Sequence, residues 1–154
     1  MLCHGKLLPG NHLHTANNDA SLVTRNKRAA GVLYSSRLKV HVRNQTRGSV
    51  LGQAVDVADT SAKRRVGLLK HDRLESGTGL WIVPCESVHT FFMKFPIDLV
   101  YLDKRRKVRK VRNAVPPWRL SACFTAHSIL ELPAGTAAQT GTRVGDELSI
   151  DKVE

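Results

Sequence analysis

The 154-residue chain has no apolar run of the roughly eighteen residues that a membrane-spanning helix needs. It has only three cysteines, an odd number and too few for a disulfide framework. Near the first residue no apolar signal segment forms, because Leu7-Leu8 is followed at once by Pro9-Gly10. These absences exclude the membrane-spanning and disulfide-rich secreted classes, and they predict a cytoplasmic protein.

Positive charge is what the sequence has in excess. It contains 24 Lys and Arg against 13 Asp and Glu, a formal net charge of +11 that favours an anionic partner. The densest run, Lys104 to Lys107, lies between two strand-like segments, which is typical of a solvated hairpin. Aromatic residues make up only 5%, and only Trp118 is near this run to stack on bases. Nucleic-acid binding is therefore an alternative rather than the favoured interpretation.

The composition divides the chain in two. Residues 1–36 are rich in His, Asn, Gly and Ser and show neither helical nor strand periodicity, so we predict a flexible polar leader there. From Leu38 the residues alternate between apolar and polar, as in a half-buried strand. Residues 37–154 are expected to form a single β-rich domain, since this length supports one core.

Within that domain many short strands and one helix are expected. The helix, at about residues 60–70, would begin at Thr60 or Asp59, bury Ala62, Val66 and Leu69, and contain Gly67. Turn signals separate the strands about every ten residues, which predicts a mainly β fold, either an antiparallel β-sandwich or a partly open β-barrel. The predicted strands cover residues 38–42, 50–58, 80–83, 88–93, 97–102, 107–111, 128–132 and 147–150.

Several motifs along residues 50–151 together resemble one family. They are Ala58-Asp59-Thr60, Arg64-Arg65, Gly67-Leu68-Leu69, Gly79-Leu80-Trp81, the run from His89 to Asp98, Leu130-Glu131-Leu132-Pro133-Ala134-Gly135 and Val144-Gly145-Asp146. They resemble the domain-of-unknown-function family 192, also called uncharacterised protein family 0127. The resemblance implies a small, mainly β fold and no particular activity. Many relatives carry the segment after a secretory or lipid-anchor leader, unlike the polar leader of this chain.

The segment from Cys85 to Asp98 gathers the most reactive side chains. If a proline bend brought them together, His89 and Asp98 would form a pair in which the carboxylate orients the imidazole as a general base. The alternative is that His89 is an ordinary strand residue and Asp98 caps a turn. On a strand, His89, Phe91 and Met93 would share one face.

Two identical spacings suggest a metal set. Cys85 and His89, like Cys123 and His127, are four residues apart and together offer two thiols and two imidazoles, the ligands of a zinc site. Extended strands separate such pairs too widely, so no metal and no cofactor are expected. A Cys85–Cys123 disulfide is a further alternative to two unrelated buried thiols.

The favoured interpretation is a non-enzymatic β-sandwich module that binds a partner or a small anionic ligand. Its ligand would contact a face that carries Lys94, Asp98 and Arg119, since arginine binds carboxylates and phosphates bidentately. Two alternatives are a small hydrolase-like enzyme that uses His89 and Asp98, and a charge-driven nucleic-acid binder. The candidate ligand-binding residues are Thr90, Met93, Lys94 and Arg119.

Overall fold

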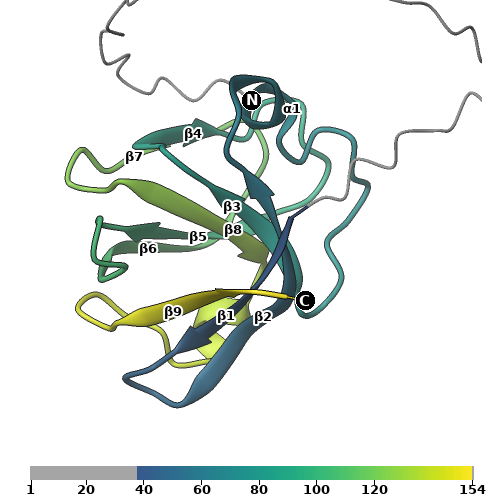
Figure 1. Cartoon of the computed structure of the whole chain (residues 1–154). Helices are drawn as coiled ribbons and strands as arrows, with labels where there is room; N and C mark the ends of the chain where they lie inside the picture. The colour runs from purple at the N-terminus through teal and green to yellow at the C-terminus, as the bar shows by residue number, and fades with distance from the viewer. Residues whose placement is uncertain (1–37, 154) are drawn as a thin grey trace, which may run out of the picture. The chain divides into compact units, whose positions relative to one another are not determined.

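A computed structural model describes residues 38–153 (Figure 1). The predicted leader, residues 1–36, lies outside the described residues. Within residues 38–153 there are nine strands and two short helices, α1 (Ser61–Val66) and α2 (Thr136–Gln139). The strands are β1 (Lys39–Asn44), β2 (Ser49–Ala58), β3 (Thr78–Ile82), β4 (Ser87–His89), β5 (Ile97–Leu102), β6 (Val108–Val115), β7 (Leu120–Ala122), β8 (Ser128–Pro133) and β9 (Leu148–Lys152). No helix in this range is long and apolar enough to span a membrane.

Seven strands form one strongly curled sheet in the order β6-β5-β8-β3-β2-β1-β9, and β4 and β7 form a separate two-stranded sheet (Figure 1). The mainly β fold predicted from the alternation is thus confirmed, as an open half-barrel. The large sheet is mixed, however, because β2 and β3 pair in parallel while its other neighbours are antiparallel. The crossover that contains α1 makes this parallel pair possible.

The basic run forms the turn of the β5–β6 hairpin, as the sequence predicts. Asp103 organises this turn by accepting hydrogen bonds from the backbone N–H groups of Arg105 at 2.8 Å and Lys107 at 3.0 Å. Arg106 adopts a positive φ of 62° at the turn. The carboxylate of Asp103 therefore shapes the turn locally. Residues 104–107 are exposed, and Arg106 also donates to Ile150 O at 3.0 Å.

The predicted helix is shorter than expected and buries no residue. Thr60 caps it, since its side chain accepts a hydrogen bond from Lys63 N at 3.3 Å. Gly67, with φ of 48°, ends the helix instead of lying inside it. The predicted apolar stripe is wrong at Ala62, which is exposed, and at Val66, which is 40% exposed, whereas Leu69 lies after the helix and packs partly against the core. Leu68, just after the helix, packs into the core instead.

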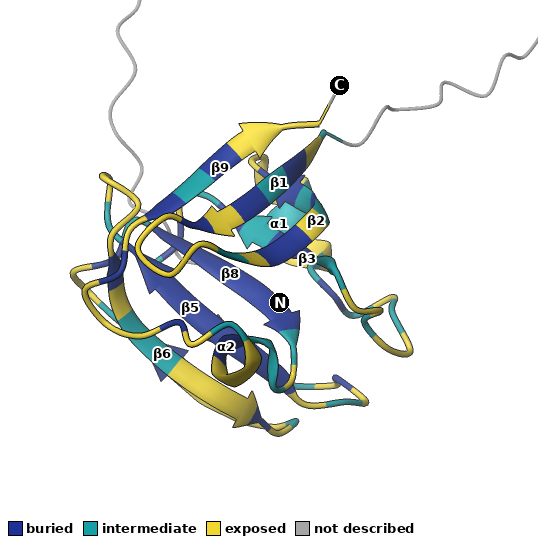
Figure 2. Cartoon of the chain, turned by 90° about the horizontal axis from the view of Figure 1, so that it is seen from below, coloured by how far each residue is buried: buried dark blue, intermediate teal, exposed yellow. Residues whose placement is uncertain are grey.

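Both faces of the central strands β5 and β8 are buried, except at the half-buried last residue of β8, Pro133 (Figure 2). On β5, Ile97, Leu99 and Tyr101 belong to one apolar cluster, which Val88 of β4 covers. Val100, on the alternate face, belongs to a second cluster inside the curl of the sheet. The two-stranded sheet therefore covers one face of the central strands, and β1, β2, β9 and α2 cover the other.

A buried ionic network joins β1 to the loop before β9. Asp146 is 2% exposed and accepts hydrogen bonds from Asn44 Nδ2 at 2.9 Å and from Arg47 Nε at 3.2 Å. Burial opposes its ionisation, but the hydrogen bonds from Arg47 and Asn44 outweigh burial and lower the pKa of Asp146 to about 2. The network therefore stabilises the fold whenever Asp146 is ionised.

We expect the D146N substitution to lower the free energy of unfolding by about 2 kcal/mol at pH 7. Since the folded pKa is depressed, this contribution is present above pH ~4 and is lost as the pH falls toward about 2. Urea unfolding between pH 2 and pH 7 measures it, and D151N, at an exposed position of β9, is the control. Equal losses in both variants would contradict the role given to the network.

Candidate functional site

His89 and Asp98, the predicted catalytic pair, do not meet. Asp98 is fully buried on β5, on the face of Val100 that points away from β4. Its carboxylate oxygens accept hydrogen bonds from Ala114 N and Ala137 N, each at 2.8 Å. His89 ends β4 and stacks on Phe91, and burial lowers its pKa. Asp98 thus acts as a backbone acceptor and does not orient the imidazole.

Three of the four predicted ligand residues lie together, because Thr90 exchanges backbone and hydroxyl hydrogen bonds with Arg119 and accepts one from Met93 N at 3.3 Å. Thr90 and Met93 are buried, with 1% and 6% exposure. Lys94 is exposed and pairs with Asp72 at 2.6 Å, and Arg119 is exposed and follows Trp118. Because Asp98 lies on the opposite face of the sheet, Lys94, Asp98 and Arg119 do not form one surface.

The zinc set is not assembled either. Across residues 38–153, no three His, Cys, Asp or Glu side chains are close enough together to hold a metal ion. His89 is turned toward Phe91, at a ring distance of 4.9 Å. Cys123 is a free thiol, which also excludes the Cys85–Cys123 disulfide.

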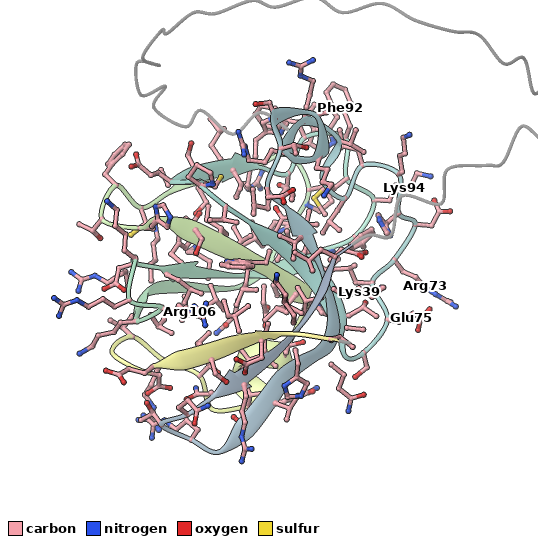
Figure 3. The ribbon with its side chains drawn as sticks, in the orientation of Figure 1. Lys39, Arg73, Glu75, Phe92, Lys94 and Arg106 are labelled. Carbon is pink, nitrogen blue, oxygen red and sulfur yellow. The ribbon has the colours of Figure 1, made fainter. Side chains whose placement is uncertain are left out.

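Four aromatic rings instead form a continuous surface, which we call the aromatic ledge: His89, Phe91, Trp118 and Phe92. Ring centroids are 4.9 Å apart for His89 and Phe91, 5.7 Å for Phe91 and Trp118, and 4.8 Å for Phe92 and Trp118. Phe92 is 69% exposed and Trp118 is 56% exposed. Figure 3 shows Phe92 at the outer edge of the molecule, at the end where α1 is drawn. Exposed rings in contact with one another are typical of interaction sites.

Thr90 holds the two loops of the ledge together. Its backbone N–H donates to Arg119 O at 2.9 Å, and its carbonyl accepts from Trp118 N at 3.0 Å. Its hydroxyl donates to Pro116 O at 2.8 Å and accepts from Arg119 N at 2.9 Å. These bonds also explain why β4 ends at His89 and not at Met93 as predicted, since at Thr90 the chain turns to meet residues 116–119. The buried candidate Thr90 therefore positions the ledge.

Both exposed rings of the ledge sit on strained backbone. Phe92 and Trp118 each have a φ of 64°, a region that bulky residues rarely adopt. Such a conformation costs about 1–3 kcal/mol and persists only where the surrounding contacts fix it. Here the hydrogen bonds of Thr90 supply those contacts. Strain of this kind gathers at functional sites, which supports a role for the ledge.

The surroundings of the ledge are apolar and positively charged. Leu120, the cross-strand partner of His89, is 70% exposed. The Arg119 guanidinium donates to the backbone carbonyl of Trp118 at 3.0 Å. Lys110 donates to Ala122 O at 2.8 Å, which places its ammonium beside β7. Chemically, the ledge offers flat apolar contact with a cationic rim.

Beneath β4 and β7 lies a buried polar layer that the sequence analysis missed. Glu131 is fully buried, and neither of its carboxyl oxygens has a hydrogen-bond partner in the described part of the chain. Burial raises the pKa of Glu131 to about 8. Burial also raises the pKa of Tyr101, on the neighbouring strand, to about 12, with Ser121 of β7 nearby. The one sequence signal for this layer was Glu131 itself, a charged residue inside the otherwise apolar strand β8.

Comparisons with known proteins agree on one family. The model of the family described as "Uncharacterized ACR", the domain-of-unknown-function family 192, matches residues 42–150. A UPF0127 protein from Thermococcus sibiricus is 34% identical over 111 residues, which cover 68% of this chain and 71% of the relative.

Two crystal structures have a similar fold. One, from Sinorhizobium meliloti 1021 and named a "putative transcription regulator", has a TM-score of 0.65 at 19% identity, over 75% of this chain and 94% of its own. The other, of a protein of unknown function from Novosphingobium aromaticivorans, has a TM-score of 0.63 at 21% identity, over 79% of this chain and 91% of its own. At these identities the likeness concerns the fold alone.

Proposed function

The chain belongs to the domain-of-unknown-function family 192, and since that membership assigns no activity, we propose from the geometry that it is a non-enzymatic binding module. Its aromatic ledge takes a ligand that combines a flat apolar group with a negative charge. The family match spans every strand that builds the ledge.

One observation carries this proposal. Phe92 and Trp118 touch edge to face, and both are more than half exposed on backbone with positive φ. Folding alone gives no reason to hold two large rings in solvent on strained backbone, because neither burial nor propensity favours it. A ligand that covers the rings would recover the apolar area that the fold leaves open.

The charge requirement comes from Arg119. Arg119 directly follows Trp118 and its guanidinium bonds the backbone carbonyl of Trp118, and a guanidinium presents a planar donor fork to carboxylates, sulfonates and phosphates. The hydrolase-like alternative has no such support, because Asp98 and His89 lie on opposite sides of the sheet. A cytoplasmic location stays a prediction from the sequence.

The dye 8-anilinonaphthalene-1-sulfonate, which joins aromatic rings to a sulfonate, tests the proposal directly. We expect one bound dye per folded chain, and we expect W118A and F92A each to weaken binding by roughly tenfold, because a lost ring contact and its buried area are worth ~1–2 kcal/mol. R119Q should weaken binding less, since it keeps the rings. Fluorescence titration of the dye gives each dissociation constant.

F124A is the matched control, because Phe124 is 83% exposed but has no ring contact with the ledge among the described residues. Its affinity for the dye should equal that of the parent protein. Dye binding that survives both W118A and F92A would place the dye elsewhere and overturn the proposal. Circular dichroism confirms that each variant is folded.

A further inference from the structure

We infer that the aromatic ledge and strand β6 together form a track for single-stranded nucleic acid. This inference rests on the proposed function and names the class of its ligand. Bases would stack on Phe92 and Trp118. Phosphates would bind Lys110 and Arg112 of β6, which precede Trp118 in sequence, and Arg119, which follows it.

The rings meet the geometric need of stacking. Neighbouring ring centroids along the ledge are 4.8 to 5.7 Å apart, and Phe92 meets Trp118 edge to face with 62° between the ring planes, so the rings are in contact but do not share one plane. Every base has a flat face, and unpaired bases gain about 1–3 kcal/mol each by stacking on aromatic side chains. The exposed indole of Trp118 and the exposed ring of Phe92 come from different loops, so each offers a separate stacking position.

The cations follow one path. Strand β6 starts at the basic hairpin turn, and three residues after its end the chain reaches Trp118. Lys110 and Arg112 are cross-strand partners of Tyr101 and Leu99, whose side chains share the face covered by β4 and β7. Lys110 already reaches the Ala122 carbonyl on β7. Arg112 is exposed and lies two residues after Lys110 in the sequence, toward Trp118. Arg119 directly follows Trp118.

Charge complementarity favours a polyanion. Residues 87–93, 108–115 and 116–122, which build the ledge and the strand leading to it, contain four arginines and lysines and no Asp or Glu. Phosphate contacts of this kind supply sequence-independent affinity. Base stacking requires more than one aromatic ring near these cations. Phe92 supplies the second ring, since it is 26 residues from Trp118 in sequence but contacts it in the fold.

The test is fluorescence anisotropy of a fluorescein-labelled oligouridylate of about twelve nucleotides, titrated with the full chain at about 50 mM salt. We expect W118A and F92A each to weaken binding by roughly 5- to 100-fold, which is the loss of one stacked base. F124A should bind like the parent protein. R112Q and R119Q should each reduce the slope of log K against log salt by about 0.7.

Two comparisons separate stacking from charge alone. A duplex of the same length should bind more weakly, because its bases are not free to stack. A polyglutamate peptide of similar charge should not displace the oligouridylate. If it does, and if the displacement depends on Trp118, the ligand of the ledge is an acidic protein and the inference of nucleic-acid binding is wrong.

Absence of binding at low salt, or equal binding by W118A, F92A and the parent protein, would overturn the inference. If the dye still binds the ledge while the oligouridylate does not, this inference fails and the proposed function stands. If neither ligand depends on Trp118, both fail.

Discussion

Replacing Glu131 with glutamine is expected to flatten the pH dependence of folding stability between about pH 5 and pH 8. The parent protein should lose roughly 3–4 kcal/mol of unfolding free energy over this range relative to E131Q. The cause is a carboxyl group that is fully exposed to water in the unfolded chain and fully buried in the fold.

The sign follows from the direction of the pKa shift. Burial raises the folded pKa of Glu131 from 4.5 to about 8, so the folded protein keeps the proton that the unfolded chain releases above pH ~4.5. The stability associated with this proton is complete at lower pH and is lost as the pH rises toward about 8. Glutamine carries no titrating proton, so E131Q lacks this loss whatever its absolute stability.

Urea unfolding of both proteins at a series of pH values measures the effect, because groups common to both cancel in the difference. Y101F is the matched control: it removes a buried hydroxyl from the same layer, but Tyr101, with a pKa of about 12, does not titrate in this range. Its pH profile should run parallel to that of the parent protein. A parallel profile for E131Q as well would mean that the charge of Glu131 is compensated in the fold.

The strands were predictable from sequence because their signal is local. Residues 97–102 alternate between two apolar faces and form β5 with the predicted bounds. Val55 and Val57 share the buried face of β2, as the spacing of two predicts. Asp103 and the basic residues after it form the predicted hairpin turn, since turn chemistry acts within a few residues.

The ledge was not predictable in the same way because distant residues create it. Alternation places Phe92 and His89 on opposite faces of one strand, but Thr90 ends that strand by bonding to residues 116–119, which are 26 or more positions away. The short strand β7 and the four-residue helix α2 were also missed, because each depends on tertiary partners more than on its own sequence. Trp118 was singled out from the sequence as an aromatic residue that could stack on bases, but its contact with Phe92 was not predicted.

Asp98, the other half of the predicted catalytic pair, is expected to be essential for stability instead. D98A should lower the free energy of unfolding by about 3–5 kcal/mol, because it removes two hydrogen bonds to a carboxylate and leaves the N–H groups of Ala114 and Ala137 without their acceptor. Ala137 N lies in α2, and Ala114 has a φ of 46°, so both ends of this bridge are segments with little local stability of their own. Chemical denaturation gives the value.

Asp103 provides a closely matched control, since its carboxylate also accepts two backbone N–H bonds but lies in an exposed turn. D103A should cost only about 1 kcal/mol, because water replaces the lost acceptor there. The milder variant D98N separates structure from catalysis: if Asp98 oriented His89, the substitution would shift the imidazole titration followed by NMR. We expect that titration to be unchanged, because Asp98 faces α2 on the opposite side of the sheet from the two-stranded sheet that carries His89.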